Sequence, residues 1–421
     1  MFGSDSLRRQ TLRWTRRRDN TDMVAALIAS MRYLGPEDRR DVLKVLRKLT
    51  RKSIGDDWFK WVQWQQENPQ IKPFEHFDLF LSSLLGSIDE GFRDLIYPGV
   101  NHSIRLEEVV WGGARSKDSG IPPIDHPTLI TAEQATYLSD DELVFGVKIG
   151  DDTRAYPYRI MDWHEMLNDV VDGVPVSLAY CTLCGSGILY DTRVGGRATP
   201  FEFGSSGLLY RSNKLMFDRE TESLWNQFTG KPVVGKLTDS GIELTTLPLV
   251  TTKWGSWRSA HPDTKVLSLD TGFKRDYRPG KPYGAYFASP KLEFPAANTD
   301  RRLSQKDQVF GLRISGAEKA WPLKLFKGGK LINDRVGVLP LVLVGDAGTS
   351  TVRAYRGNGE VFTLADDSLR RVQSKSGSWQ VHEDALHGPN GARLTRLPGH
   401  IAYWFAWSNY LGAAPLATDT P

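Results

Sequence analysis

The sequence predicts an α+β fold, in which a helical N-terminal region precedes a large β-rich domain. Apolar residues recur at helical spacing within residues 22–98. From residue 99 onward, short β-type runs alternate with Gly, Asp and Pro, as is typical of β-rich domains. The 421 residues are 25% charged and 40% hydrophobic, which is the composition of a globular protein with an ample core.

The chain begins with a basic segment. Its first twenty residues contain six arginines and only two aspartates, which accounts for the formal net charge of +4. We expect residues 1–21 to be a disordered arm that stays solvated or touches an acidic partner or membrane surface. The rest of the chain is balanced in charge. Because nucleic-acid binding needs a basic stripe across a domain, nucleic acid is not a predicted partner.

Residues 22–98 are predicted to form paired helices. Apolar residues from Val24 to Met31 fall at i, i+3, i+4 and i+7, and those from Val42 to Leu49 repeat this spacing. Gly35-Pro36 separates the two segments. Amphipathic helix pairs with short turns resemble HEAT repeats, which bind protein partners. We therefore predict a HEAT-like region with a partner-binding role.

Residues 99–421 are predicted to form the β-rich domain, with a subdivision near residue 300. One helix is expected at residues 160–170, before the turn at Asp172-Gly173. The sequence contains no Gly-rich phosphate-binding loop and no G-x-S-x-G elbow, so no nucleotide cofactor is predicted. The clearest β-type runs are residues 143–149, 174–179, 187–191, 338–344 and 351–355.

The location of the protein is predicted from two features of the sequence. No stretch approaches about 18 consecutive apolar residues, so no membrane span is expected. The N-terminus carries charges where a signal peptide has an apolar segment. These features predict a cytoplasmic protein, and they leave its oligomeric state open.

The two cysteines of the chain form one C-x-x-C motif, Cys181 and Cys184. Apolar runs on both sides place the motif at the tip of a β-hairpin. Gly185 follows, as in C-x-x-C-G knuckles that hold metal ions, where a glycine can take a positive φ. Metal binding is the leading interpretation, and a reversible disulfide or a pair of inert buried thiols are the alternatives.

Further ligands of such a metal must be sought among the histidines. His164 lies on the predicted helix that leads into the cysteine strand, and His261 and His400 are the next candidates. Each histidine could instead belong to a hydrogen-bonded core. Glu165 follows His164 and is the candidate proton-transfer residue, although a glutamate on a helix is more often solvated.

A polar and aromatic cluster follows the cysteines and is the predicted substrate-binding wall. Its candidate residues are Tyr210, Arg211, Asp218 and Arg219. Polar groups interleaved with large aromatic side chains suit a pocket. A β-turn with an internal Asp–Arg pair would explain the same residues.

The combination of these motifs resembles a bacterial family named domain of unknown function 3179. The resemblance covers about residues 115–350 and implies that His164, the two cysteines and His261 belong to one motif set. It excludes the helical N-terminal region. The sequence departs from the family at Thr182, where relatives commonly have proline. Many relatives are exported, unlike the location predicted above. The runs that carry the resemblance are Trp163-His164-Glu165, Cys181 to Gly187, Ser206 to Tyr210, Met216 to Arg219, Trp257 to Pro262 and Arg275 to Tyr277.

The leading functional hypothesis is a metal-dependent enzyme, an oxidoreductase that acts on a small organic substrate. Its mononuclear site would consist of Cys181, Cys184 and His164, with a fourth position open for substrate. Soft ligands favour copper or zinc over iron. One alternative is a non-catalytic protein with a structural zinc site closed by His261 and a HEAT-like partner-binding end. Another alternative is a thiol–disulfide redox protein.

Overall fold

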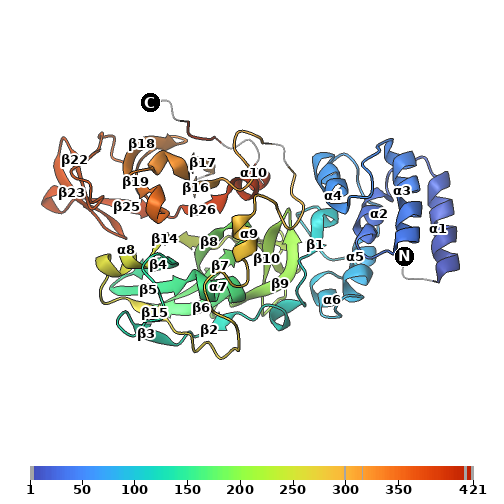
Figure 1. Cartoon of the computed structure of the whole chain (residues 1–421), viewed down its shortest axis with the longest axis horizontal. Coiled ribbons are helices and arrows are strands. Elements are labelled where there is room, and N and C mark those ends of the chain that lie inside the picture. Colours follow the sequence, from blue (N-terminus) through green and yellow to red (C-terminus); the bar gives the residue numbers. More distant parts are fainter. Residues whose placement is uncertain (1–3, 298–299, 315, 412–414, 419–421) are drawn as a thin grey trace.

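The computed structural model describes residues 4–297, 300–314, 316–411 and 415–418. Helices form one end of the molecule, and two groups of β-sheets lie beside each other at the other end (Figure 1). The predicted α+β class, with helices first and a large β-rich part after them, is confirmed.

The helical region packs around its own apolar core. Leu27 and Leu46, which belong to the two periodic runs of the sequence, are buried in it together with Trp61. The helices are α1 (Asp5–Arg17), α2 (Val24–Met31), α3 (Pro36–Thr50), α4 (Trp58–Glu67), α5 (Phe77–Gly86) and α6 (Phe92–Leu95).

The expectation of a disordered arm at residues 1–21 is wrong for most of its length, because Asp5–Arg17 forms helix α1. Ser4 Oγ accepts a hydrogen bond from the backbone N–H of Leu7 at 3.3 Å and caps the helix. Leu12 and Thr15, three residues apart, are buried on one face, and α1 packs on α3. The buried face is narrow, and because arginines occupy many of the remaining positions, the sequence of this segment resembles that of a solvated arm.

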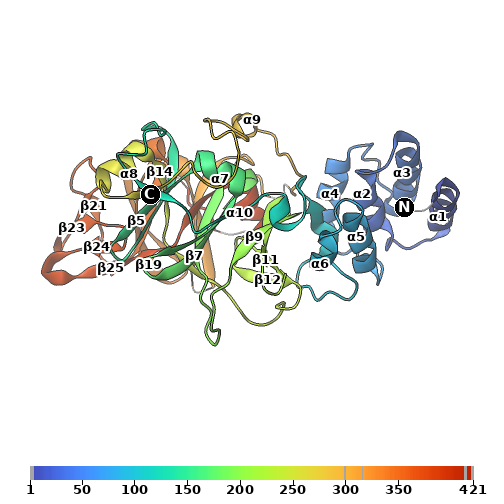
Figure 2. The ribbon, with the colours of Figure 1, turned by 90° about the horizontal axis from the view of Figure 1, so that it is seen from below.

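Three five-stranded sheets make up the first β group (Figures 1 and 2). The first sheet contains β1 (Val109–Trp111), β9 (Phe203–Tyr210), β10 (Asn213–Asp218), β11 (Leu224–Asn226) and β12 (Lys231–Val234). The second contains β13 (Thr245–Leu247), β8 (Ser186–Asp191), β7 (Val174–Cys181), β6 (Met166–Val171) and β2 (Ile124–Asp125). The third contains β14 (Val250–Lys253), β4 (Leu143–Ile149), β5 (Asp152–Pro157), β15 (Lys265–Leu267) and β3 (Leu129–Thr131).

Three helices accompany these sheets, and one of them is shorter than the sequence predicts. They are α7 (Tyr158–His164), α8 (Trp254–Ala260) and α9 (Gly284–Ala288). The helix predicted at residues 160–170 ends at His164, because Glu165 takes a left-handed conformation with φ of 57°. The following residues form β6, which pairs antiparallel with β7. The apolar pattern of these residues is compatible with a helix or a strand, and the pairing with β7 therefore decides their structure.

The C-x-x-C motif lies where the sequence predicts it, at the tip of a hairpin. Strand β7 ends at Cys181, a short 3₁₀ turn covers Thr182–Cys184, and β8 begins at Ser186. Gly185 has φ of 58°, and a Cβ there would lie 3.2 Å from the Tyr403 ring. Glycine is favoured at this position for both reasons.

The second β group begins at residue 308. A three-stranded sheet has the order β17 (Ala317–Pro322), β16 (Gln308–Ile314), β26 (His400–Tyr403). An eight-stranded sheet contains β18 (Lys330–Val336), β19 (Leu339–Asp346), β20 (Thr351–Arg356), β25 (Arg393–Leu397), β24 (Ala385–His387), β23 (Gly377–Val381), β22 (Arg371–Ser374) and β21 (Thr363–Leu364). Helix α10 (Trp404–Leu411) follows β26 and carries Trp404 and Trp407 into the core.

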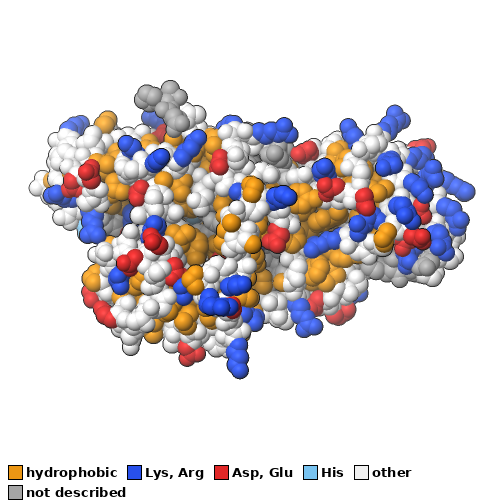
Figure 3. All heavy atoms as spheres, in the orientation of Figure 1, with side chains coloured by type: hydrophobic (Ala, Val, Ile, Leu, Met, Phe, Trp, Pro, Cys, Tyr) orange, Lys and Arg blue, Asp and Glu red, His pale blue; other side chains and the backbone are white. Residues whose placement is uncertain are grey.

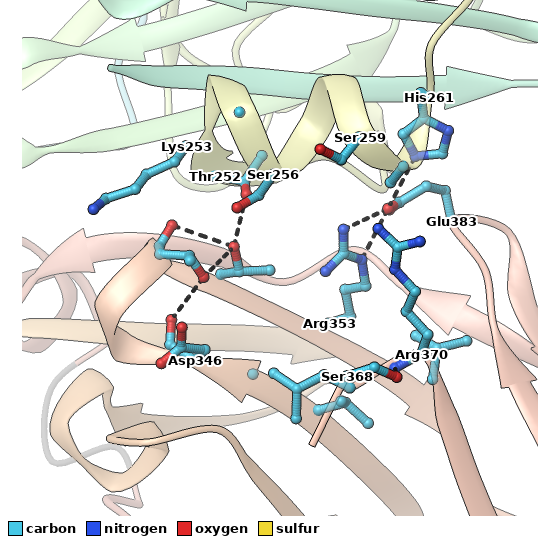
Figure 4. Close-up of a pocket in the computed structure, with 18 of the residues that line it drawn as sticks. Thr252, Lys253, Ser256, Ser259, His261, Asp346, Arg353, Ser368, Arg370 and Glu383 are labelled. Carbon is cyan, nitrogen blue, oxygen red and sulfur yellow. Dashed lines mark hydrogen bonds and ion pairs between the residues drawn. The ribbon is translucent and has the colours of Figure 1, made fainter. Parts of the chain in front are cut away.

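A buried ionic cluster joins the two β groups (Figure 4). Glu383 accepts hydrogen bonds from Arg353, at 2.9 Å from Nε, and from Arg396. Arg396 also donates to the carbonyl of Leu249, just before β14 in the first β group. Burial would raise the pKa of Glu383, but the two arginines hold it well below its usual range.

We predict that Glu383→Ala destabilises the protein by about 3–5 kcal/mol, because it leaves the buried guanidinium of Arg396 and the partly buried one of Arg353 without their carboxylate. Urea unfolding measures this loss. Asp367→Ala, an exposed neighbour in the same cavity, is the control and should change stability by less than about 0.5 kcal/mol. Equal small effects of both substitutions would contradict the role given to Glu383.

Candidate functional site

A cavity of about 640 Å³ lies where the helical region meets the first β group. We call it the Glu165 pocket. Arg32, Trp58 and Phe59 line it from the helical region, and the β-rich part supplies the other walls. Its polar and charged lining residues are Arg32, Asp162, Glu165, Ser205, Lys214, Arg275, Tyr283 and Glu293.

An ion pair is buried in this pocket. Lys214 Nζ lies 2.9 Å from Glu165 Oε2 and donates a hydrogen bond to Ser205 Oγ at 2.7 Å. The hydroxyl of Thr182 donates to Glu165 Oε1 at 3.2 Å. Lys214 is 3% exposed and Glu165 8%. A buried pair of this kind needs such additional hydrogen bonds, because both charges have lost their water.

A second carboxyl group, Asp162, lines the pocket one helical turn before Glu165. It is 6% exposed, and its Oδ1 is buried without a hydrogen-bond partner among the described residues. Burial, and then the charge of Glu165, raise the pKa of Asp162 to about 8, although a hydrogen bond with Tyr180 acts in the opposite direction. Asp162 therefore holds a proton at neutral pH, beside a glutamate that forms an ion pair.

Two arginines add positive charge to the pocket. Arg275 is exposed, lies over the Trp163 ring at 5.7 Å, and forms no ion pair with a carboxylate in the described part of the chain. The Arg32 guanidinium lies 5.0 Å from the Trp111 ring centroid and donates to the Trp111 carbonyl. Arg32 is thereby fixed in the wall between the two regions.

The two cysteines are buried behind the pocket, next to Leu183, which lines it. Their sulfur atoms lie 2.8 Å apart and both are free thiols. Burial raises the pKa of Cys184 well above its usual value. Thiols in such surroundings are inert, although these two are placed to form a disulfide.

His164 does not join the cysteines. Its Nδ1 lies 2.8 Å from the carbonyl of Pro122, and its Nε2 lies 2.6 Å from the hydroxyl of Tyr277. Burial lowers the pKa of His164 to about 4, which keeps the ring neutral. Both ring nitrogens are occupied, so this histidine belongs to a hydrogen-bonded core.

The predicted metal site does not fit the donors that the structure brings together. Within the described residues, no three His, Cys, Asp or Glu side chains converge on a point where they could hold a metal ion. His400 lies elsewhere, beside Phe228 and Trp407, and its buried Nε2 has no hydrogen-bond partner among the described residues. The Cys181–Cys184–His164 set is therefore not assembled.

His261 borders a different cavity, of about 900 Å³, between α8 and the second β group (Figure 4). Its ring packs on Trp257 at 4.1 Å, and its Nε2 lies 3.6 Å from Glu383. The acidic and basic side chains that line this cavity are nearly equal in number, and several of them pair with each other. We assign His261 to the joint between the β groups.

The four predicted substrate-binding residues do not line the Glu165 pocket. Arg211 pairs with the buried Glu108 and donates to the carbonyl of Asn409, and Tyr210 packs against Tyr410. These contacts attach α10 to the first sheet.

The acidic member of the predicted wall also has a structural role. Asp218 is buried and accepts hydrogen bonds from Thr221 and from Trp225 Nε1, at 2.8 Å for the indole. Arg219 pairs with Asp118 and Asp125. The alternative of a turn with polar pairs therefore describes this segment better than a substrate wall.

Sequence reasoning named Glu165 but missed Asp162, Ser205, Lys214 and Arg32. Lys214 gave one usable signal, because a lysine among the apolar residues of a strand must find a partner when the strand is buried. The partner itself lies 49 positions earlier in the chain. Arg32 gave no signal, since it lies in a different region of the sequence.

The family to which the chain belongs is described as Protein of unknown function (DUF3179), and its model matches residues 118–414. The match covers most of the β-rich part and excludes the helices that complete the pocket. No curated protein and no solved structure matches the chain. Among the described helices, none has the length and apolar character needed to cross a membrane.

We predict that the buried, neutral His164 makes stability depend on pH. Its folded pKa of about 4 lies below the ordinary value of 6.5. The unfolded chain therefore binds the proton first, and stability falls as the pH drops below about 6.5. Between about pH 7 and pH 5 this amounts to about 2 kcal/mol.

Urea unfolding at the two pH values, of the wild type and of His164→Gln, measures this contribution. The difference between the two proteins isolates His164, because groups such as Asp162 titrate in both. A variant with the pH dependence of the wild type would show that His164 is not held neutral.

We also predict that neither thiol reacts in the folded protein. Ellman's reagent at about pH 8 should label Cys181 and Cys184 only slowly, because both are buried and burial raises the pKa of the Cys184 thiol. In urea the same reagent should count two thiols. Rapid labelling of the native protein would show that the hairpin tip is accessible.

Proposed function

We propose that the protein is an enzyme that acts on a small organic anion in the Glu165 pocket by general acid–base catalysis. The observation that carries this proposal is a pair of carboxyl groups with different surroundings in one cavity. Asp162 is protonated at neutral pH, and Glu165 forms an ion pair with Lys214. Two carboxyl groups held in different surroundings within one cavity are typical of acid and base roles.

In this proposal Asp162 is the proton donor. Its Oδ1 has no hydrogen-bond partner in the part of the chain that the structure describes, so no protein group competes with a substrate for it. Glu165 is the proton acceptor, and Thr182, Ser205 and Lys214 orient its two oxygens. Reactions that need one proton delivered and another removed, such as isomerisation or elimination, match this pair.

The charges of the pocket support an anionic substrate. With Asp162 protonated, Arg32, Lys214 and Arg275 face only Glu165 and Glu293. Trp58 and Phe294 provide apolar walls beside these charges. A substrate with a carboxylate near an apolar body would satisfy both features.

The metal-dependent oxidoreductase predicted from the sequence is not part of this proposal, because its ligands do not come together. A thiol–disulfide role is the second candidate, favoured by the 2.8 Å separation of the two sulfur atoms. Slow labelling of the native thiols would count against it, and rapid labelling would support it. The partner-binding role of a HEAT-like region stays a prediction.

We predict that Asp162→Asn and Glu165→Gln each lower turnover by at least about 10²-fold, as expected for loss of a general acid or base. A panel of small carboxylic acids, followed by proton NMR, identifies the substrate. Asp263→Asn, an exposed carboxyl outside the pocket, is the matched control and should retain activity. Full activity of Asp162→Asn would contradict the proposed role.

The titration of Asp162 provides a test that does not need the substrate. The infrared band of a protonated carboxyl should disappear with a midpoint near pH 8, and Asp162→Asn should lack it. Activity should fall over the same range, because the acid loses its proton. A wild-type band that is absent at neutral pH would overturn the assignment.

A further inference from the structure

The helical end of the molecule concentrates positive charge far more than the sequence average indicates. Residues 1–52 contain 14 Lys and Arg but only 6 Asp and Glu, so the rest of the chain is net negative. Basic side chains cover much of this end in the space-filling view (Figure 3). Helix α1 is its outermost element (Figure 1).

Helix α1 is held against α3 in a fixed orientation. Arg8 pairs with Asp38 at 3.1 Å near the start of both helices, and Lys48 donates to the carbonyl of Arg16 near their ends. The helices are therefore parallel, and their basic C-terminal turns lie together. These turns carry Arg16, Arg17, Arg47 and Lys48, with Arg51 and Lys52 just beyond α3.

The outer face of α1 combines apolar and basic side chains. Leu7 and Trp14 are 53% and 54% exposed, and they share one side of the helix because they are seven residues apart. Arg17, three residues after Trp14, is exposed next to it, and Arg13 is exposed further around the helix. Neither arginine forms an ion pair with a carboxylate that the structure describes.

The carboxylates near this face are few and mostly engaged. Asp38 pairs with Arg8, and Asp22 pairs with Arg18. Glu37 and Asp41 pair with residues of α3 itself, and Asp19 lies 3.8 Å from Lys48. The exposed arginines of α1 therefore produce a strong positive electrostatic potential on the solvent side of the helix.

We propose that this end of the molecule docks on the surface of an anionic phospholipid membrane through α1. The arginines would contact the lipid phosphates, while Trp14 and Leu7 enter the interface between headgroups and acyl chains. A nucleic acid would use the charge but not the exposed leucine. The Glu165 pocket is lined by Arg32, Trp58 and Phe59 and by the β-rich part, and by no residue of α1, so docking through α1 leaves it open.

Sedimentation with phosphatidylcholine vesicles, with and without about 30% phosphatidylglycerol, tests the proposal on the full chain. The protein should bind only the anionic vesicles, and about 0.5 M salt should release it, because the Debye length then falls to about 4 Å. Absence of binding to the anionic vesicles would overturn the proposal. Tighter binding to an oligonucleotide than to the anionic vesicles, at an equal concentration of negative charge, would overturn the proposal in favour of a nucleic-acid partner.

Two variants test the surface itself. Replacement of Arg9, Arg13 and Arg17 by Gln should weaken vesicle binding by at least about tenfold, and Trp14→Ala should weaken it with less effect on its salt dependence. The matched control replaces three exposed lysines of the β-rich part by Gln and should bind as the wild type does. Binding unchanged by the arginine or Trp14 substitutions would contradict docking through α1. The three control lysines are Lys236, Lys327 and Lys375.

Discussion

The buried ion pair between Glu165 and Lys214 is the constraint on which the centre of the molecule depends. The Glu165 backbone carbonyl accepts the N–H of Tyr180 in β7, and its side chain reaches Ser205 in β9 and Lys214 in β10. One residue thereby connects α7 and two sheets. It does so with φ of 57°, a conformation that costs a residue other than glycine about 1 kcal/mol or more. Strain of this kind persists where the surroundings determine it, which is typical of functional sites.

This constraint also explains the role of the C-x-x-C hairpin. Thr182, between the two cysteines, donates its hydroxyl to Glu165, and Leu183 lines the pocket. Tyr286 of α9 donates to the carbonyl of Leu183 and covers the turn. The hairpin tip thus supports the carboxylate from behind. Because cysteine is rare in the sequence, the C-x-x-C motif indicated the correct hairpin. The residues that face the pocket, however, are the neighbours of the cysteines and not the cysteines themselves.

Local patterns in the sequence predicted those structural elements that interactions between neighbouring residues determine. The periodic apolar residues of α2 and α3 gave their helices, and the glycine after Cys184 marked the hairpin tip. Residues 166–170 are apolar enough for a helix or a strand, and pairing with the neighbouring strand β7 decides between the two. His164 faces Pro122 and Tyr277 instead of the cysteines, and both partners are distant from it in the sequence. Hydrogen bonds between residues more than 40 positions apart leave no pattern in a single sequence.

The composition of the Glu165 pocket bears on how the two regions of the chain depend on each other. The family match starts at residue 118, whereas Arg32, Trp58 and Phe59 of the preceding helices form one wall of the cavity. Gln65 also donates to the carbonyl of Glu107, and Gln63 to that of Ala296, so the helices are attached to the β-rich part by hydrogen bonds as well as apolar contacts. In the proposed function, part of the wall that faces the substrate therefore comes from a region outside the family match. The helical region is in this sense part of the pocket, and its outermost helix presents the basic face proposed to dock on an anionic membrane.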